Sequence, residues 1–431
     1  MSGKTILFWP ESAYGPTNNC IGIGNVLKNR GHNVVFAAES SWGGKLSPLG
    51  FKEELVDLSA PPENADAQSA GQFWKDFTIQ DHTSPEFKKP TVEQLETFIT
   101  PTRQALIDGA IYSEPRLKEI IAKHKPDVIV EDNVLCFPAT ITAGVPFVRV
   151  VSCNPLEILG ENIAPPFSGL AENDPASWIS YNQAYEKSQR PMWEKFNSWV
   201  VSQGAPALPD LDFIHTSKDL NMYVYPTELD YTDKRPLGNN WHRIDSSVRS
   251  TDAAFELPQE ITNRPADSKL IYLSLGSLGS ADVDLMKRLI SILGKTKHKF
   301  IVSKGPQASE YELASNMFGA EFLPQISIIP KVDLVITHGG NNTTTESVHF
   351  GKPMIVLPLF WDQYDNAQRV HEKGHGIRLA TYAFKDEELT GAIDKLLNDS
   401  ALLAKLNKIG EAVRSRKGIE EAATKIEALA K

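Results

Sequence analysis

The sequence predicts an α/β protein with two parallel-sheet domains. The chain has 431 residues, more than one hydrophobic core usually organises. Short apolar segments alternate with longer segments of helical periodicity in two separate stretches of the chain. Between them, residues 229–265 are rich in Pro, Asp, Asn and Ser, as interdomain connections often are. We therefore expect a first domain over residues 1–235, a connection over 236–265 and a second domain over 266–410.

The composition restricts the class of protein. Hydrophobic residues make up 41% of the chain and charged residues 23%, as in ordinary soluble globular proteins. The formal net charge of −10 argues against nucleic acid or an anionic membrane as a partner. No signal-peptide pattern opens the chain, and no apolar run approaches the roughly 20 residues that cross a bilayer. We expect a cytoplasmic protein without a membrane span, and a monomer, although the sequence does not reveal its oligomeric state.

The elements of the first domain follow from the alternation. A short apolar strand comes first, and the helix that follows it is closed by Gly31. A later buried strand ends at the acidic pair Glu131-Asp132. The expected strands are residues 5–9, 33–37, 127–130 and 147–151, and the expected helices are residues 21–30 and 111–123.

The second domain repeats the pattern. Its first strand runs into the turn Leu275-Gly276-Ser277, and Gly351-Lys352-Pro353 stops a later helix. The expected strands are residues 270–274, 299–302, 332–337 and 354–358, and the expected helices are residues 285–293, 343–350, 386–397 and 401–429.

The loop between the strand 332–337 and the next helix is a natural anion site. Free N–H groups and the positive end of the helix dipole both point at whatever binds there. Gly339 and Gly340 allow the backbone to approach a ligand closely. His338, Asn342 and Thr343 add hydrogen-bond donors. The loop therefore predicts a site for phosphate groups.

Polar residues beyond this loop extend the site. Glu346 lies about one helical turn further on, where its carboxylate can accept hydrogen bonds from a ribose. Asp362 and Gln363 follow the next parallel strand, at the edge where open α/β sheets bind ligands. Diphosphate, ribose and polyol in this order outline a nucleotide sugar. A buried unit whose polar residues are merely caps explains Thr343, but it does not explain Glu346 together with Asp362 and Gln363.

The same stretch resembles the donor-sugar signature of the family 1 UDP-glycosyltransferases. That signature reads aromatic-x-Pro-Gln, Thr-His-x-Gly-x-Asn-[Ser/Thr] with a following Glu, Gly-x-Pro, Pro-x-x-x-Asp-Gln and Asn-Ala, and residues 322–367 match it almost throughout. Within the family, the chain resembles a soluble branch of bacterial macrolide-type and arthropod (mite-like) detoxification enzymes. The resemblance implies the GT-B fold, in which two Rossmann-like domains face each other across a cleft. The first would bind the acceptor and the second the UDP-sugar, while a C-terminal helix, residues 411–431, would cross back to the first.

The resemblance assigns roles to individual donor-site residues. It places the ring of Phe322 on the uracil, the turn at Gly276 against the phosphates, and Asp362 with Gln363 on the hydroxyls of glucose. Trp361 is expected either to line the sugar pocket or to pack in the core. The donor-binding residues expected in this way are Gly276, Ser277, Lys304, Phe322, Pro324, Gln325, His338, Gly340, Asn341, Asn342, Thr343, Glu346, Trp361, Asp362 and Gln363.

The resemblance also implies an inverting, metal-independent transfer. In the family, a His after the first strand takes the acceptor proton, and an Asp after a later strand holds that His. Asp132 is the candidate carboxylate here, with Glu131 as the alternative. We expect no cofactor beyond the UDP-sugar co-substrate. We also expect no metal, because Cys20, Cys136 and Cys153 are widely spaced and no ligand cluster is visible.

The catalytic His is missing, because Pro16 stands at its place in the family pattern. Three explanations remain open. Asp132 accepts the proton itself, assisted by Tyr14, Glu11 or Asn18; or the acceptor supplies an ionised phenol or an amine; or the protein binds a nucleotide sugar without turning it over. General-base assistance is typically worth about 10²–10⁴-fold in rate. Its loss predicts a preference for phenols or amines over aliphatic alcohols.

Aromatic residues of the first domain are expected to shape the acceptor site. They lie in two irregular or helical regions, 55–112 and 155–209, where aromatic residues at such spacing are usually core, but the matching regions of the family bind the acceptor. The candidates are Trp74, Phe77, Phe87, Trp178 and Tyr181. The expected function is transfer of glucose to a small lipophilic acceptor, such as a phenol, flavonoid or amine xenobiotic, in detoxification or secondary metabolism. The alternatives are a catalytically silent binder of nucleotide sugar or lipophile, and an antibiotic-type deoxysugar transferase.

Overall fold

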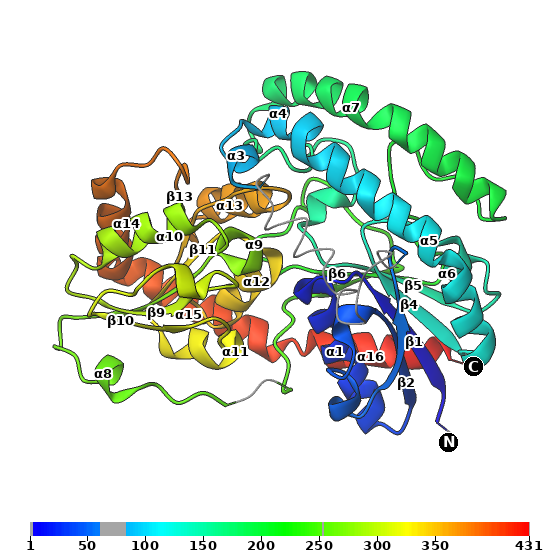
Figure 1. Ribbon diagram of the computed structural model, residues 1–431, viewed down its shortest axis with the longest axis horizontal. Helices are drawn as coiled ribbons and strands as arrows, with labels where there is room; N and C mark the ends of the chain where they lie inside the picture. Colours follow the sequence, from blue (N-terminus) through cyan, green and yellow to red (C-terminus); the bar gives the residue numbers. More distant parts are fainter. Residues whose placement is uncertain (1–2, 61–82, 252–253, 431) are drawn as a thin grey trace.

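A computed structural model describes residues 3–60, 83–251 and 254–430, and within them it forms two parallel sheets side by side (Figure 1). The first sheet has the spatial order β3 (Lys52–Val56), β2 (Asn33–Glu39), β1 (Thr5–Pro10), β4 (Val128–Asp132), β5 (Phe147–Val151), β6 (Leu220–Val224) and β7 (Trp241–Ile244). The second has the order β10 (Met317–Ala320), β9 (Lys299–Ser303), β8 (Leu270–Ser274), β11 (Leu334–Thr337), β12 (Met354–Val356) and β13 (Gly376–Arg378). Every described pairing is parallel, which confirms the predicted pair of Rossmann-like sheets.

Helices connect these strands and cover both faces of each sheet. The longer ones are α1 (Tyr14–Asn29), α5 (Thr100–His124), α7 (Pro175–Ser202), α10 (Val283–Leu293), α12 (Asn341–His349), α13 (Gln363–Glu372), α14 (Asp386–Asn398), α15 (Ser400–Ser415) and α16 (Gly418–Leu429). The shorter ones are α3 (Thr83–Phe87), α4 (Thr91–Gln94), α6 (Pro138–Ile141), α8 (Gln259–Thr262), α9 (Gly276–Gly279) and α11 (Gln325–Ile328). None of the described helices has both the length and the apolar character that crossing a membrane requires.

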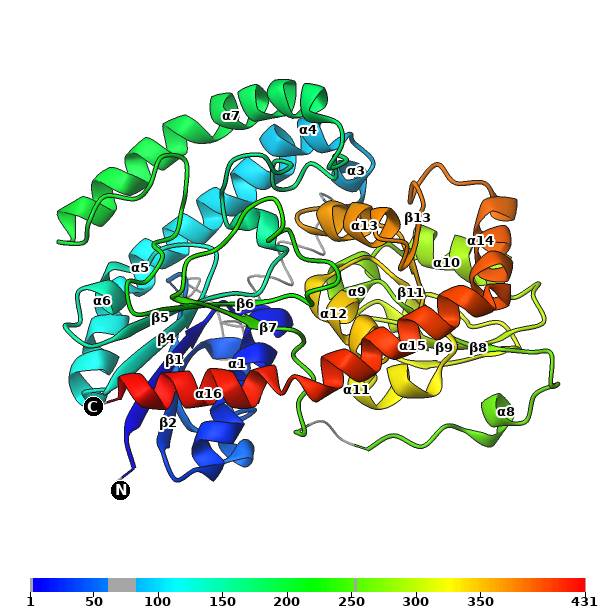
Figure 2. The ribbon, with the colours of Figure 1, turned by 180° about the vertical axis from the view of Figure 1, so that it is seen from behind.

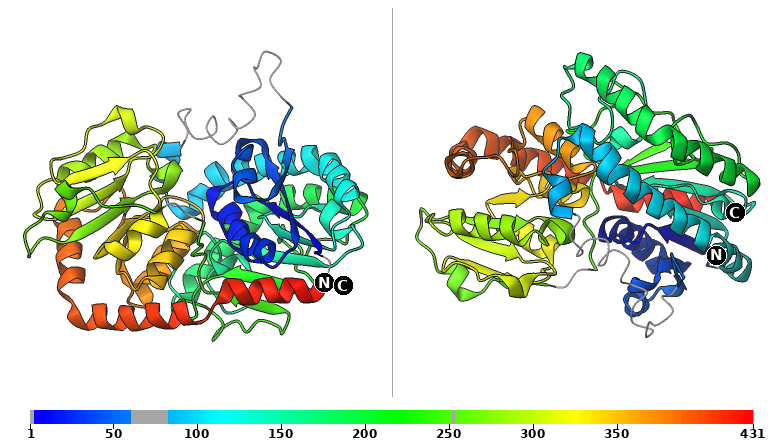
Figure 3. Two further views of the ribbon diagram at one scale, coloured as in Figure 1. Left: turned by 90° about the horizontal axis from the view of Figure 1, so that it is seen from below. Right: turned by 45° about the horizontal axis from the view of Figure 1, so that its top comes forward.

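Burial on both faces explains why the strands of the first sheet are apolar along their whole length. In β1, Ile6 and Phe8 pack in the cluster that holds α1 and α16, whereas Leu7 and Trp9 pack in the cluster that holds α5 and α7. Alternate residues of a strand point to opposite faces, so a sheet covered on both sides needs apolar residues at every position. Figure 3 shows α5 and α7 layered over one side of this sheet.

The two domains share a continuous apolar interface. One core cluster contains Tyr223 of β6 and Tyr225 just after it, together with Val335 of β11 and Met354 of β12. The C-terminal helices also join the domains, because α15 packs on α12 of the second domain and α16 packs on α1 of the first (Figure 2). The chain turns between these helices at Lys417, which has a φ of +50°. The helix that the sequence predicts over residues 401–429 is therefore two helices.

Two further boundaries differ from the sequence predictions. The segment predicted as an interdomain connection contains β7, a half-buried edge strand whose His242 and Arg243 interrupt any apolar run. The first helix begins at Tyr14 and not at Ile21, so Pro16 lies in its first turn. Proline is tolerated there because the first N–H groups of a helix have no partner inside the helix.

A buried ion pair ties the centre of the first sheet together. Glu131 and Arg149 are register partners on β4 and β5, their side chains are fully buried, and 2.8 Å separates Oε1 from Nη1. Arg149 Nε also donates to the carbonyl of His215 at 2.9 Å. Removing one partner of such a pair leaves an uncompensated charge in a medium of low dielectric constant.

We therefore expect Arg149→Met to lower the free energy of unfolding by about 3–5 kcal/mol. The matched control is Lys297→Met, which removes an exposed ion pair with Asp267 and should leave the free energy of unfolding almost unchanged. Urea unfolding followed by circular dichroism measures both. Equal effects of the two substitutions would contradict this account of the buried pair.

Candidate active site

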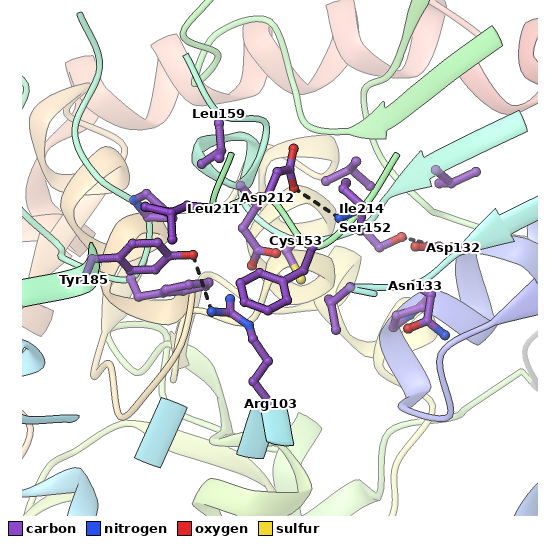
Figure 4. A pocket seen from close by; sticks show the side chains of 18 residues that line it. Arg103, Asp132, Asn133, Ser152, Cys153, Leu159, Tyr185, Leu211, Asp212 and Ile214 are labelled. Atoms are coloured by element: carbon purple, nitrogen blue, oxygen red, sulfur yellow. Dashed lines mark hydrogen bonds between the residues drawn. The ribbon is translucent and has the colours of Figure 1, made fainter. Parts of the chain in front are cut away.

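A pocket opens at the carboxyl ends of β4 and β5 and encloses about 550 Å³ free of protein atoms, partly open to solvent (Figure 4). Its walls combine apolar rings with buried ionisable groups. The polar side chains that line it are those of Arg103, Asp132, Asn133, Ser152, Cys153, Glu157, Tyr185 and Asp212. The apolar ones are those of Pro16, Val134, Val150, Val151, Leu159, Pro166, Phe167, Leu211, Phe213 and Ile214.

Asp132 ends β4 and faces this pocket with a carboxyl group that is 2% exposed. The hydroxyl of Ser152 donates to its Oδ2, and the amide of Asn19 donates to that hydroxyl at 2.6 Å. Its Oδ1 takes no hydrogen bond from any residue that the structure describes. Burial raises the pKa of Asp132 to about 7, against the opposing effects of Ser152 and Arg149. The carboxyl group is thus oriented, half-ionised near neutral pH and open to a ligand.

Pro16 lines the same pocket, so no imidazole lies between Asp132 and the cavity at this position. The three suggested helpers lie outside the pocket lining. The Glu11 carboxylate accepts from Ala13 N at 2.9 Å, and the ring of Tyr14 is half-exposed. Asn18 is not the residue linked to Asp132. Its neighbour Asn19 donates to the Ser152 hydroxyl, which in turn donates to Asp132. The alternative carboxylate Glu131 pairs with Arg149 away from the pocket.

The predicted phosphate loop has the expected strand–loop–helix form. β11 ends at Thr337, and α12 begins at Asn341 with Gly340 at its N-cap. The N-terminus of α12 meets that of α1, because the Asn342 amide donates to the carbonyl of Gly15 at 3.2 Å. Two helix starts therefore converge on one place, which strengthens the positive potential there.

His338 shapes this loop as a neutral group. Burial lowers the pKa of its imidazole to about 4. A Cβ atom at Gly276 would lie 2.8 Å from its Nε2, and one at Gly340 would lie 2.6 Å away. Both glycines therefore leave room for the histidine ring. Any attraction of this loop for phosphate comes from N–H groups and helix dipoles and not from an imidazolium charge.

The predicted ribose-binding carboxylate sits in a network of donors. Glu346 is 2% exposed, and Gln325 donates to its Oε2 at 2.6 Å and to Thr343 Oγ1 at 3.1 Å. Arg249 Nη1 lies 3.9 Å from its Oε1. Pro324 is the N-cap of α11, which begins with Gln325. The network orients the carboxylate, as acceptance from hydroxyl groups requires.

Two of the three residues predicted to read the sugar, Asp362 and Trp361, bind to the first domain, whereas Gln363 binds within the second. Asp362 Oδ2 accepts from Asn154 N at 2.9 Å, and Gln363 Oε1 accepts from Leu359 N at 3.1 Å. Trp361 donates its Nε1 proton to Glu157 Oε1 at 2.8 Å and packs on the ring of Phe167, so it contacts two residues that line the pocket.

Asn341 is also predicted to bind the donor, but its side chain binds the first domain instead. Its Nδ2 donates to the carbonyls of Ser152 and Val224, both at 2.8 Å. The amide therefore holds the two domains together, because the side chain that follows Gly340 points toward the first sheet.

The remaining donor-site predictions lie around the cleft edge. Ser277 is exposed in the turn after β8, and Lys304 follows β9 with its ammonium 4.9 Å from the ring of Tyr311. The Phe322 ring is 58% exposed and lies 6.3 Å from the ring of Tyr14. Such an exposed ring face is available for stacking.

The acceptor residues were predicted poorly. Phe87 is buried against Phe360, with 4.7 Å between ring centroids, and Tyr181 packs in the same core cluster. Trp178 donates its Nε1 proton to the carbonyl of Ala171. These three line no part of the pocket. Helical spacing in this region therefore reports core packing. Trp74 and Phe77 lie outside the described residues.

Several residues that line the pocket could not be found by sequence reasoning. Arg103 comes from α5, Glu157 from the turn after β5, and Phe167, Asp212 and Phe213 from irregular segments. No motif or period connects these positions. Burial raises the pKa of Glu157 to about 8 and that of Asp212 to about 6. Among the described residues, no three His, Cys, Asp or Glu side chains are placed to hold a metal.

Comparisons with known proteins agree with this geometry. A model of the UDP-glucoronosyl and UDP-glucosyl transferase family matches residues 178–410, more than half of the chain. The NDP-glycosyltransferase YjiC of Bacillus subtilis (strain 168) is 24% identical over 424 residues, covering 97% of this chain and 95% of that protein. The oleandomycin glycosyltransferase of Streptomyces antibioticus is 24% identical over 436 residues, covering 98% and 90%.

The solved glycotransferase of kitacinnamycin superposes with a TM-score of 0.69 at 18% identity, covering 99% of each chain. The predicted GT-B fold is confirmed by this likeness. The resemblance to bacterial macrolide-type enzymes is also confirmed, while the resemblance to arthropod enzymes stays a prediction.

The raised pKa of Asp132 has a consequence for stability. The folded protein holds this proton up to about pH 7, whereas an unfolded chain releases it near pH 4. Ionisation of Asp132 therefore destabilises the fold progressively between these values. Asn mimics the protonated carboxyl group and does not ionise.

We expect Asp132→Asn to gain stability relative to the parent as pH rises from 4 to 7, by about 2–4 kcal/mol at pH 8. Urea unfolding at pH 4, 6 and 8 measures the difference. Asp267→Asn, at an exposed carboxylate paired with Lys297, is the control and should show no such gain. A variant that instead loses relative stability with rising pH would show that the fold stabilises the carboxylate.

Proposed function

The chain belongs to the UDP-glucoronosyl and UDP-glucosyl transferase family, and from this premise we propose that it moves glucose from UDP-glucose to a small lipophilic phenol. It is a glycosyltransferase with a GT-B fold. The observation that carries the proposal is the pocket that Asp132 lines together with apolar and aromatic residues, while Ser152 donates to only one of its two carboxyl oxygens. No metal or cofactor takes part in the proposed reaction, and the anomeric centre is inverted in one displacement.

The proposed proton acceptor is Asp132. A base works best when its pKa lies near the working pH, and burial raises the pKa of this carboxyl to about 7. Ser152 and Asn19 fix one oxygen and leave the other for the acceptor hydroxyl. The leaving UDP is stabilised by the N-terminus of α12, whose N–H groups are oriented before the reaction begins.

The proposed donor site has one part for each component of the nucleotide sugar. The exposed face of Phe322 receives the uracil, and Glu346 accepts from the ribose. The glucose assignment derives from the Asp362-Gln363 pair that the family places on sugar hydroxyls.

A deoxysugar donor, as in antibiotic-type transferases, is the second candidate. One specific observation favours it: Asp362 Oδ2 and Gln363 Oε1 already accept from backbone N–H groups. Fewer acceptors then remain for sugar hydroxyls. Sugar release measured with UDP-glucose and with dTDP-deoxysugars on one phenol separates the two donors, and release from neither would favour a silent binder.

The proton-transfer role predicts how Asp132→Asn affects different acceptors. We expect a loss of about 10²–10⁴-fold in kcat/KM for a phenol of pKa near 10, and a much smaller loss for a nitrophenol that is already ionised at pH 8. For the parent protein and the weakly acidic phenol, kcat/KM should rise with pH through an apparent pKa near 7. Product formation followed by chromatography gives both quantities. Equal losses for the two phenols would assign Asp132 a role in structure and not in proton transfer.

The donor role of Glu346 is tested by binding alone. We expect Glu346→Gln to weaken UDP binding by about 10–100-fold, because a ribose hydroxyl loses a charged acceptor. Titration calorimetry measures the dissociation constant. Glu260→Gln, on the exposed face of α8, is the matched control and should bind UDP like the parent. No heat with UDP for the parent itself would overturn the proposed donor.

A further inference from the structure

A buried cation faces the pocket without an ion-pair partner among the described residues. Arg103 on α5 is 5% exposed and lines the cavity together with Asp132. Its Nη1 donates to Gln189 Oε1 at 2.5 Å and, more weakly, to the hydroxyl of Tyr185 at 3.4 Å. Throughout residues 3–60, 83–251 and 254–430, Arg103 forms no ion pair, and its Nε and Nη2 make no hydrogen bond. Two donor groups of a desolvated guanidinium are therefore unused, which is unfavourable unless a ligand accepts from them.

Aromatic rings hold this guanidinium in place. Its central carbon lies 4.3 Å from the centroid of Phe213, 5.5 Å from that of Phe167 and 5.6 Å from that of Trp361. Such contacts stabilise a cation and fix the plane of its N–H groups, but they provide no hydrogen-bond acceptor of ordinary strength. The rings also offer flat apolar surfaces to whatever enters the pocket.

Three carboxyl groups face the same pocket, and none forms an ion pair with Arg103, although its charge acts to lower the pKa of Glu157 and Asp212. Glu157 accepts from Trp361 Nε1, and Asp212 accepts from Ile214 N at 3.2 Å. Burial raises the pKa of Glu157 to about 8, so this group is mostly neutral at pH 7 and is a poor counter-ion. Asp132 is on another side of the pocket, beside Ser152 (Figure 4).

We infer that Arg103 selects the acceptor: it donates to a carbonyl or carboxylate oxygen of an aromatic molecule whose phenolic hydroxyl lies at Asp132. This inference rests on the proposed function and specifies its acceptor class. The aromatic part packs against Phe167 and Phe213, and Arg103 Nε and Nη2 donate to the oxygen. Hydrogen bonds from a charged donor are stronger than neutral ones, and a site built for them discriminates against a molecule that lacks the acceptor atom.

The test uses phenols that differ only at the far end. The set is 3-(4-hydroxyphenyl)propionate, its methyl ester, 4-butylphenol and 4-(3-aminopropyl)phenol. A saturated linker keeps the acidity of the phenol nearly constant, so differences report the remote group. With UDP-glucose as donor, we expect kcat/KM of the parent to be about 10–100-fold higher for the acid and the ester than for butylphenol. The amine should be the poorest acceptor, because its cation meets Arg103.

Variants connect this preference to the residue. Arg103→Met should reduce the difference between ester and butylphenol to about threefold or less, and Arg103→Lys should restore part of it. The matched control is Arg190→Met on α7, whose exposed guanidinium pairs with Asp210, and the control should keep the parental ratio. UDP affinity, measured by calorimetry, should be unchanged in all three, which verifies that they fold.

Equal use of ester and butylphenol by the parent would overturn the inference, and so would a parental ratio that persists in Arg103→Met. A preference for the amine would also overturn it, by assigning the selectivity to Glu157 and Asp212. The parental panel alone decides the question if Arg103→Met does not fold. If no phenol accepts glucose, the proposed function fails, and calorimetric binding of the same four compounds still tests Arg103.

Discussion

The segment Ser152–Glu157, which follows β5, is bound on both sides and determines the geometry of the whole site. From the second domain, the Asn341 amide donates to the Ser152 carbonyl, and Asp362 accepts from Asn154 N. From the first domain, the Ser152 hydroxyl donates to Asp132. One short stretch therefore connects the loops that follow β11 and β12 with the carboxyl group in the pocket. A displacement of one domain relative to the other would move Ser152 and change the hydrogen bonding of Asp132.

Exclusion of water follows from this packing and explains the unusual acid–base properties. Glu157, Asp132 and Asp362 are buried near the domain contact, and burial raises the pKa of each one. A surface carboxylate would be solvated and ionised at neutral pH. In this interior, hydrogen bonds and charges act more strongly than they would in water, which favours stabilisation of a developing charge. The same desolvation makes the guanidinium of Arg103, which has no ion pair among the described residues, unfavourable unless a ligand accepts from it.

The donor half of the site could be predicted from sequence because its residues are contiguous. A strand, a glycine loop and a helix start are local features, and residues 334–349 form them as expected. What the sequence could not reveal is the partner of each side chain. Asn341 and Asp362 have the residue types that a sugar or phosphate needs, but both bind the first domain. Hydrogen-bonding capacity is a property of the residue type, whereas the partner depends on the approach of a distant segment.

The acceptor half was beyond prediction for a related reason. Its walls come from α5, from the turn after β5 and from irregular segments near residues 166 and 212, which share no period or motif. Aromatic residues at helical spacing, such as Tyr181 and Phe87, are instead core residues that the long helices bury. The start of the first helix was also predicted wrongly. Because α1 begins at Tyr14, Asn19 and not Asn18 lies toward Ser152. Fold class survives such errors since it depends on alternation, which a shift of a few residues does not change.

Pro16 replaces the histidine that serves as the base in the family, and this replacement supports the proposed role of Asp132 in proton transfer. A histidine next to Asp132 would become an imidazolium ion when it took a proton, and a neighbouring cation lowers the pKa of a carboxyl group. Pro16 has no charge and occupies the first turn of α1, where its missing N–H is tolerated. Without a further cation at this position, burial raises the pKa of Asp132 to about 7 despite the opposing effect of Arg149. The same change that removes the usual base thus gives the remaining carboxyl group the basicity and the access that proton transfer requires.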